Sequence, residues 1–349
     1  MSVVIVSVDA DGVSNEHVTS TVCPMALAAT SVGSYDGAMS IGSRPLVPSR
    51  MAPGGVVHGS RQPRNRVGAF IALTKPRIIE LLLITTVPTM VLAENGWPST
   101  WLVMLTLIGG ALAAGGANTI NMYVDRDIDA LMERTRHRPL VTGLVQPNEA
   151  LVFAVVLEIA AFAVLWASAN FLSAVLALSA TAFYIGVYTL WLKRTSRQNI
   201  VIGGAAGAVP VLVGWAAVTN SLSIVPVILF AVIFFWTPPH FWALALRYAD
   251  DYRSANVPML PAIVPFRAAH TQMIAHTIAL VISSVLVSIV SNDLGAVYLV
   301  SAIALGAAFL LGTIRLGKNP SESASMRLFG FSITYITLLF AALTIDVLV

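Results

Sequence analysis

The sequence predicts an all-α, polytopic membrane protein with about nine transmembrane helices. Of its 349 residues, 57% are hydrophobic and only 11% are charged, and the mean hydropathy is +0.81. A soluble domain carries about 25% charged residues, so this composition excludes one. Two further observations support the prediction: apolar runs of membrane-spanning length, and basic residues confined to alternate loops.

Nine apolar runs can be marked as candidate spans, and crossing the hydrocarbon core takes about 17 to 25 helical residues. The first run is short, and only the turn "ASANF" separates the third from the fourth. The expected spans cover residues 78–93, 100–123, 149–168, 170–190, 200–218, 222–238, 269–291, 294–315 and 327–348.

The basic residues identify the cytoplasmic side. If the N-terminus is cytoplasmic, the odd-numbered loops are "ENGWPST", "ASAN", "TNSLS" and "SNDLG", and none contains Lys or Arg. All twenty basic residues then lie in the N-terminal segment or in the even-numbered loops. The positive-inside rule therefore predicts a cytoplasmic N-terminus, an external C-terminus and cytoplasmic charged loops. The net charge of +3 reflects this bias and not nucleic-acid binding.

Residues 1–65 differ from the rest of the chain. They lack helical periodicity, are rich in Ser, Gly, Val and Pro, and contain the single cysteine, Cys23. We expect a disordered cytoplasmic extension here and a transmembrane domain over residues 66–349. The extension has four acids and no Lys or Arg before Arg44, whereas a mitochondrial presequence is rich in Arg and poor in acids. The expected location is a bacterial plasma membrane.

The stretch "NTINMYVDRDIDALMERTRHRPL" concentrates charge at the cytoplasmic end of the second span. Asn121, Asp125 and Asp129 follow an i, i+4, i+8 spacing, which places them along one face of a helix. These three residues are called the acid stripe. Asp127 points to a different face. A solvated helix end would accept acids and bases in any order. Oxygen-bearing side chains on one stripe repel one another without a cation between them, and acids near a helix C-terminus oppose its dipole, so we favour a cation site.

The ligand chemistry narrows the choice of cation. Hard oxygen ligands, without cysteine or clustered histidine, suit Mg²⁺ or Mn²⁺. Mg²⁺ held by few carboxylates usually completes its shell with water and substrate phosphates. Arg134 and Arg138, just downstream, are suited to bind the same phosphates. The stretch therefore predicts a divalent metal and diphosphate site.

Three other cytoplasmic segments carry candidate site residues. In "WTPPHFWALALRYADDYRSANVPMLP", Pro238 and Pro239 are expected to end the sixth span. Basic residues in such loops are by default membrane anchors, so their role as anion ligands stays open. A lone histidine beside aromatic residues is more often a structural donor than an iron ligand, and both interpretations are kept. The candidates at and after the end of the sixth span are Trp236, His240, Arg247 and Asp251. Those around the end of the fourth span are Tyr188, Lys193 and Arg194, and those before the first span are Lys75 and Arg77.

These stretches resemble the intramembrane prenyltransferase superfamily named for the ubiquinone-pathway enzyme, and within it the branch that prenylates haem. The matching motifs are "LTKPR", "NMYVDRDIDALMERTRHRPL", "YTLWLKRTSRQNIVIGGAAGAVP" with "GW" just after, and "PPHFWALALRYADDYRSANVPMLP". The resemblance covers roughly residues 68–349, and the last motif is the one specific to the haem branch. The superfamily's second motif often has two acids four residues apart. Here Arg247 stands in place of the first, which leaves Asp251 as the expected contributor.

The resemblance implies a bundle of nine helices around a lipid-accessible chamber, capped by acid-bearing cytoplasmic loops. The implied reaction transfers farnesyl from farnesyl diphosphate to a vinyl group of haem B, with water added. The product is haem O, used in the assembly of haem–copper terminal oxidases, so haem B is a substrate and not a cofactor. The implied partners are these two substrates, the lipid bilayer, and haem A synthase or oxidase assembly factors.

The resemblance also implies roles for the candidate residues. Catalysis and the binding of Mg²⁺, or Mn²⁺, fall to Asn121, Asp125, Asp129 and Asp251. The acceptor and the allylic carbocation would contact Tyr188, Trp236 and His240, the last as candidate iron ligand. Diphosphate or the haem propionates would be bound by Arg134, Arg138, Lys193, Arg194, Lys75, Arg77 and Arg247.

Two alternatives remain at this stage. A sister enzyme that prenylates a quinone precursor or chlorophyllide would share the acid stripe but not the "PPHFW" loop. A transporter would place ionisable groups near the bilayer midplane, whereas the acid clusters here lie at the cytoplasmic ends. Glu158, within the third span, is the main exception.

Overall fold

The computed structural model describes residues 65–349, and for residues 77–83 it describes the backbone alone. The expected extension, apart from its last residue, lies outside the described part, as does the side chain of Arg77. Asn65 begins that part by capping helix α1 (Arg66–Thr74), where its side chain accepts a hydrogen bond from the Gly68 N–H (2.8 Å).

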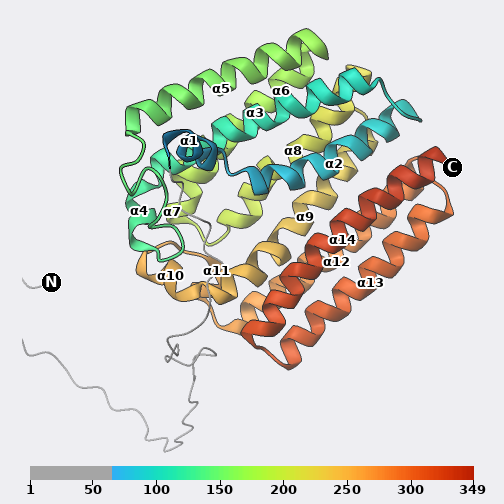
Figure 1. Cartoon of the computed structure of the whole chain (residues 1–349). Helices are drawn as coiled ribbons and strands as arrows, with labels where there is room; N and C mark the ends of the chain where they lie inside the picture. Colours follow the sequence, from blue (N-terminus) through green and yellow to red (C-terminus); the bar gives the residue numbers. More distant parts are fainter. Residues whose placement is uncertain (1–64) are drawn as a thin grey trace, which may run out of the picture. The chain divides into compact units, whose positions relative to one another are not determined.

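The described part is helical throughout and confirms the expected membrane architecture (Figure 1). The first expected span corresponds to α2 (Pro76–Glu94), whose described apolar portion is Ile84–Glu94. Eight further helices are long and apolar enough to cross a membrane, and each matches one expected run. They are α3 (Thr100–Val124), α5 (Pro147–Ser168), the continuous stretch Phe171–Thr195, α8 (Asn199–Thr219), α9 (Ile224–Arg247), α12 (Phe266–Val290), α13 (Ala296–Lys318) and α14 (Glu322–Leu348).

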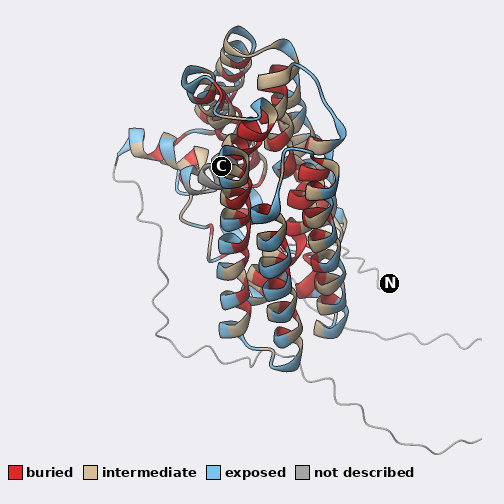
Figure 2. Cartoon of the chain, turned by 90° about the vertical axis from the view of Figure 1, so that its right-hand side faces the viewer, coloured by how far each residue is buried: buried red, intermediate tan, exposed pale blue. Residues whose placement is uncertain are grey.

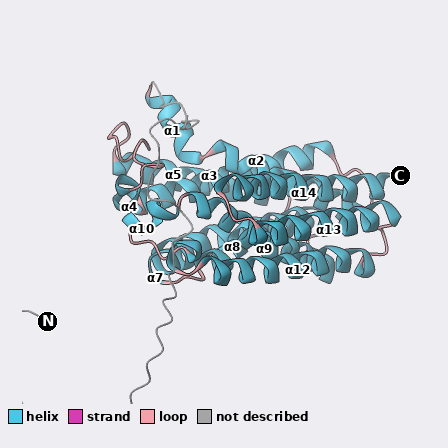
Figure 3. Ribbon diagram, turned by 90° about the horizontal axis from the view of Figure 1, so that it is seen from below, coloured by secondary structure: helices cyan, strands magenta, loops and turns pink. Residues whose placement is uncertain are grey.

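Short helices gather at one end of this bundle, and the C-terminus lies at the other (Figures 1 and 3). The charged loops of the sequence form this end, so residues far apart in the chain meet there. The short helices are α4 (Arg126–Leu131), α7 (Lys193–Thr195), α10 (Ala249–Ser254) and α11 (Leu260–Ile263).

Burial separates an inner from an outer face on the long helices (Figure 2). Large apolar side chains remain exposed, such as Trp101 at 72% and Ile289 at 71%, as expected for a surface that faces lipid. Small residues allow close packing inside. A Cβ added at Gly116 of α3 would lie only 2.5 Å from the Glu158 Oε1 of α5.

The expected end of the sixth span at Pro238 and Pro239 is wrong. Helix α9 continues through both prolines to Arg247, and both rings are buried. Proline is tolerated inside a membrane helix where neighbouring helices and Thr side chains compensate for the lost backbone hydrogen bonds. Here the missing N–H groups are those that would bond to the carbonyls of Phe234 and Phe235, four residues earlier, and the helix continues without them.

The fourth span departs from a single α-helix. It consists of α6 (Phe171–Phe183), a π-helical segment η1 (Tyr184–Leu192) and the short α7. Asn170 begins it as the N-cap, accepting from the Ser173 N–H (2.9 Å), so the turn expected at "ASANF" is present. π-helical turns occur frequently at functional sites, and η1 lies beside the acid stripe.

Candidate functional site

The acid stripe is buried where α3 passes into α4. Asp125 caps the end of α3, and the backbone hydrogen bonds continue across it, from Asp125 N to Asn121 O (2.9 Å) and from Asp129 N to Asp125 O (2.8 Å). The three residues Asn121, Asp125 and Asp129 are 3%, 0% and 2% exposed. Helical spacing thus survives the interruption and turns all three side chains inward.

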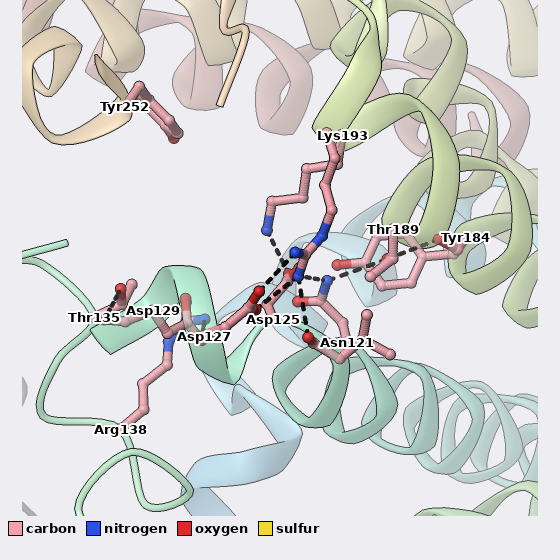
Figure 4. Close-up of polar contacts among 12 residues, drawn as sticks. Asn121, Asp125, Asp127, Asp129, Thr135, Arg138, Tyr184, Thr189, Lys193 and Tyr252 are labelled. Carbon is pink, nitrogen blue, oxygen red and sulfur yellow. Dashed lines mark hydrogen bonds and ion pairs between the residues drawn. The ribbon is translucent and has the colours of Figure 1, made fainter. Parts of the chain in front are cut away.

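Basic side chains from distant segments meet this stripe (Figure 4). Lys193 of α7 forms an ion pair with Asp125, and Arg138 Nη1 lies 2.5 Å from Asp129 Oδ2. Lys75 Nζ donates to Asn121 Oδ1 (2.9 Å), and the amide nitrogen of Asn121 donates to Asp125 Oδ2 (2.7 Å). The structure therefore brings six of the predicted site residues into one connected cluster: Lys75, Asn121, Asp125, Asp129, Arg138 and Lys193.

Asp127 faces away from the stripe, as its position in the helix predicts. Its carboxylate accepts two hydrogen bonds of 2.7 Å from the guanidinium of Arg194. This pairing lowers the pKa of Asp127 to about 2. Arg194 Nη2 also lies 3.8 Å from Asp125 Oδ1, so Arg194 joins the exposed pair to the buried stripe.

The stripe offers oxygen ligands suited to a divalent cation. Asp125 Oδ1 is buried and accepts no hydrogen bond, which leaves one carboxylate oxygen free to coordinate. Within residues 65–349, no three His, Cys, Asp or Glu side chains are grouped as a metal site. Two carboxylates and the Asn121 carbonyl are too few for a closed metal site, but they fit a cation that also takes water and substrate phosphate as ligands.

Lys75 occupies the junction between α1 and α2 in a left-handed conformation (φ 53°). Burial, together with the nearby charges of Arg138 and Lys193, lowers its pKa well below the usual 10.5. A buried amine beside other cations stabilises an incoming anion strongly once it is protonated. This lysine is thus suited to bind a phosphate group.

Aromatic residues of η1 line the inner side of the site. The rings of Tyr184 and Tyr188 stack, with centroids 5.4 Å apart and an interplanar angle of 17°. The Thr189 hydroxyl accepts from the Asn121 amide (3.2 Å) and donates to the Tyr184 carbonyl (2.9 Å). The π-helical segment is therefore hydrogen-bonded directly to the acid stripe.

An apolar cavity of about 310 Å³ lies beneath these tyrosines. Helices α2, α3, α6, η1, α8 and α9 all contribute to its wall. Asn118, one turn before Asn121, lines it and donates to the Thr74 carbonyl (3.0 Å). The wall also includes Gly110, Ala114, Thr181, Tyr184, Tyr188, Gly203, Gly207, Val213 and Phe241.

The second acid-bearing loop (residues 248–265, between α9 and α12) meets the first (residues 132–146, between α4 and α5). Asp251 Oδ2 accepts from the backbone N–H of Arg134 (3.3 Å), and Arg134 Nη2 donates to the Tyr252 hydroxyl (3.3 Å). Tyr252 projects from α10 (Figure 4). Asp250 instead pairs with Arg253, and Arg247 Nε lies 3.1 Å from Glu322 of α14. Asp251 and Arg134 are thus the residues that join the two loops.

Two predicted residues lie apart from the cavity wall. Trp236 donates to the Ser332 carbonyl of α14 (2.8 Å), and His240 Nδ1 lies 2.6 Å from the Ser332 hydroxyl. The His240 ring stacks between Trp236 (4.1 Å) and Phe329 (4.6 Å). Because α9 continues as a helix here, both side chains turn toward α14 and not toward the cavity.

Three residues of the site were absent from the sequence predictions. Asn118 lies seven residues before Asp125, and Tyr184 lies four before Tyr188, so helical periodicity could have found both. Thr189 had no such signal, because its contact with Asn121 depends on the π-helical register of η1.

The fold and the site together define a membrane-embedded bundle in which a buried cluster of acids and basic residues lies next to an apolar cavity. The model of the UbiA prenyltransferase family matches residues 82–340. The chain belongs to this family.

Relatives and solved structures agree with the assignment. The chain is 53% identical over 282 residues to a protoheme IX farnesyltransferase of Parafrankia sp., covering 80% of this chain and 90% of that one. It is 50% identical over 305 residues to a protoheme IX farnesyltransferase of Streptomyces coelicolor, covering 84% and 96%.

The fold is similar to two kinds of solved structure. One is a digeranylgeranylglyceryl phosphate synthase (TM-score 0.67, 18% identity, 81% of this chain and 98% of that one). The other is a UbiA homologue from Archaeoglobus fulgidus bound to GPP and Mg²⁺ (TM-score 0.59, 19% identity, 79% and 99%). At these identities the likeness concerns the fold.

Proposed function

We propose that this chain transfers the farnesyl group of farnesyl diphosphate to a vinyl group of haem B and thereby makes haem O. The observation that carries the proposal is the direct connection between the acid stripe, with its basic partners, and the apolar cavity. The acceptor is supported by relatives at about 50% identity that are named protoheme IX farnesyltransferase.

The head group binds at the stripe. Lys75, Lys193, Arg138 and Arg194 stabilise the negative charge that grows on diphosphate as its bond to farnesyl C1 breaks and it takes the electron pair. A bound Mg²⁺, or Mn²⁺, would supply further charge neutralisation there, held by Asn121, Asp125 and Asp129. Asp251 belongs to this site as the acid of the second loop.

The hydrocarbon part occupies the cavity. The apolar wall excludes water from the allylic cation that diphosphate leaves behind. The ring faces of Tyr184 and Tyr188, at the top of the cavity, stabilise this cation by cation–π contact.

The acceptor completes the reaction. The terminal vinyl carbon of haem B donates its π electrons to farnesyl C1 and forms the new carbon–carbon bond. The inner vinyl carbon then carries the positive charge, a water molecule adds to it, and loss of one proton leaves the hydroxyl group of haem O. The charged loops, and therefore both head groups, lie on the cytoplasmic side of a bacterial plasma membrane, with the N-terminus inside and the C-terminus outside.

The test is a reconstituted assay. The purified full-length protein is given haem B, farnesyl diphosphate and Mg²⁺, and the product is identified by mass spectrometry. Haem O is the expected product, and its formation should stop in Asp125→Asn. Parallel reactions with a quinone precursor and with chlorophyllide give the competing outcomes, since product from either in place of haem O contradicts the proposal. Transport in proteoliposomes that persists in Asp125→Asn would favour a transporter.

A further inference from the structure

Arg134 differs from the other arginines of the site because no carboxylate neutralises it. In the described part of the chain, its guanidinium has no Asp or Glu oxygen within ion-pair distance. Arg138, Arg194 and Arg247 each pair with an acid. The carboxylate of Asp251 accepts a hydrogen bond from the backbone N–H of Arg134 and not from its side chain.

One donor of this guanidinium is also unsatisfied. Arg134 Nε is buried and has no hydrogen-bond acceptor, while Nη2 donates to the Tyr252 hydroxyl. A buried donor without an acceptor is costly unless a ligand supplies one. A guanidinium with unused donors is suited to a carboxylate, which can accept two parallel hydrogen bonds from it.

Aromatic rings surround the same group. The guanidinium carbon of Arg134 lies 5.3 Å from the ring centroid of Tyr248 and 5.7 Å from that of Tyr252. Tyr188, which lines the cavity, and Tyr248 both pack against the hydrophobic cluster that contains Tyr252. The unpaired cation therefore lies between the second loop and the mouth of the cavity, in surroundings that suit a flat, largely apolar molecule with an anionic edge.

The diphosphate already has other partners. Lys75, Lys193 and Arg138 contact the acid stripe itself, on the side of α3 and α7. Arg134 instead faces α10. Lys75, Lys193 and Arg138 therefore lie on the side of the cavity entrance that suits the donor. Arg134 lies on the other side, which is left for the acceptor.

We propose that Arg134 binds a carboxylate of the acceptor, a haem propionate, and so orients the vinyl edge of haem toward the cavity. This inference rests on the proposed function and specifies how one of its substrates is held. Tyr248 and Tyr252 flank the guanidinium, and Tyr252 fixes its orientation through the hydrogen bond to Nη2.

The experiment compares haem B with its dimethyl ester, which lacks both carboxylate charges. Wild-type protein should prefer haem B over the ester roughly ten- to a hundredfold in kcat/KM, as expected when a charge-assisted hydrogen bond is lost. Arg134→Gln should lower activity with haem B and bring this preference close to one, and Arg134→Lys should retain part of it. The KM for farnesyl diphosphate should stay within about threefold in both, since the donor-side contacts are unchanged.

Arg136→Gln is the matched control. It removes an exposed arginine of the same loop whose ion pair is with the exposed Glu133. It should leave unchanged both the preference for haem B over the ester and the KM for farnesyl diphosphate. Haem binding measured from the Soret absorption gives a second readout that does not need turnover, and it should weaken in Arg134→Gln for haem B but not for the ester.

The outcomes distinguish a failure of the proposed function from a failure of the role inferred for Arg134. Wild-type protein that makes no haem O contradicts the proposed function, whereas the Soret titration still tests Arg134. An Arg134→Gln variant that raises the KM for farnesyl diphosphate and keeps the preference for free propionates would overturn the inference and assign this arginine to the donor. Wild-type protein that binds and uses the ester as well as haem B also overturns it.

Discussion

Asp125 occupies the centre of the site. One oxygen of its carboxylate receives hydrogen bonds from Asn121 and Lys193, and the other is buried without a donor. A carboxylate with a free oxygen, fully removed from solvent, is poised to coordinate a cation without rearrangement. Lys193 forms its ion pair with Asp125, so a change at either residue leaves the charge of the other unpaired.

We expect Asp125→Asn to reduce kcat/KM for farnesyl transfer by roughly a hundred- to a thousandfold, because it removes the central anionic ligand for the cation that stabilises diphosphate. Asn has nearly the same shape, so the fold should be retained, but the temperature of unfolding should fall because the buried Lys193 loses its anionic partner. Steady-state kinetics and thermal unfolding of the purified variant measure the two effects. Asp127→Asn is the control, since Asp127 is exposed and pairs with Arg194 outside the stripe. Near-wild-type turnover in Asp125→Asn would remove Asp125 from the catalytic site.

Lys75 predicts a pH dependence. Its pKa lies well below the usual 10.5, because burial and the charges of Arg138 and Lys193 disfavour the ammonium form. The ammonium form binds phosphate, so affinity is full below this lowered pKa and is lost as pH rises through it. A single titrating group can change affinity by at most about tenfold per pH unit.

The measurement is the Kd of Mg²⁺-pyrophosphate as a function of pH, in the wild type and in Lys75→Met. Pyrophosphate titrates in both, so the difference between the curves isolates the lysine. The wild type should bind more tightly than Lys75→Met at pH values below the lowered pKa of Lys75, and converge toward Lys75→Met as pH rises through that pKa. Parallel curves over the whole range would show that Lys75 stays charged or does not contact phosphate.

Residue patterns within one segment were predictable, whereas contacts between segments were not. The spacing of Asn121, Asp125 and Asp129 placed them on one stripe, and the structure confirms that geometry. Their partners Lys75 and Lys193 lie 46 and 68 residues away in the chain, and no local pattern specifies such contacts. Their roles in binding metal and diphosphate remain predictions.

At the scale of elements, the fourth span shows how a helix can be recognised while its geometry is missed. The apolar run at 170–190 predicted a span, but not the π-helical segment within it. That segment sets the rotation of Tyr188 and the hydrogen bond from Asn121 to Thr189. Similarly, the pair Pro238–Pro239 predicts a helix end in water, but inside a bundle their lost hydrogen bonds are tolerated and α9 continues. His240 and Trp236 therefore contact α14 and do not line the cavity, and their role toward the acceptor remains a prediction.

Helix α8 offers a test of the contact between its glycines and η1. A Cβ added at Gly203 would overlap the ring of Tyr188, whereas one added at Gly207 would meet no atom within 4 Å. Both glycines line the cavity. We expect Gly203→Ala to displace Tyr188 and lower kcat/KM roughly tenfold, the loss expected when a positioned aromatic group moves by a fraction of an ångström.

Gly207→Ala is the matched control, because it adds the same methyl group to the same helix and the same cavity. Its activity should stay within about twofold of the wild type. The kinetics with haem B and farnesyl diphosphate give the comparison, and thermal unfolding reports whether Gly203→Ala also destabilises the bundle. Equal activities in the two variants would show that the position of Tyr188 does not matter for turnover.

At the scale of the whole molecule, the distribution of charge and the arrangement of helices agree. The loops that the positive-inside rule assigned to one side gather at one end of the described bundle, where the acid stripe and the second loop meet (Figure 3). Composition and periodicity were enough to predict this, because the number and length of spans follow from the thickness of the membrane. The cavity was expected only through the family resemblance, since its shape depends on which small residues face one another across six helical segments.

Metal removal tests how the site and the whole fold depend on each other. Each buried acid of the stripe already has a protein cation beside it, Lys193 for Asp125 and Arg138 for Asp129. The bundle therefore does not need a metal to neutralise these acids, and EDTA should leave the temperature of unfolding nearly unchanged. Diphosphate, in contrast, adds negative charge to a place that holds two carboxylates, so its binding should require a divalent cation.

We expect EDTA to abolish the formation of haem O and to weaken the binding of farnesyl diphosphate at least tenfold, about the loss of one strong charge-assisted contact. Excess Mg²⁺ or Mn²⁺ should restore both. Binding of haem B, followed from its Soret absorption, serves as the internal control, because the guanidinium of Arg134 contacts Tyr248 and Tyr252 and no proposed metal ligand, so this binding should be unaffected. Turnover that continues in EDTA would show that Lys75, Lys193 and Arg138 stabilise the departing diphosphate without a metal.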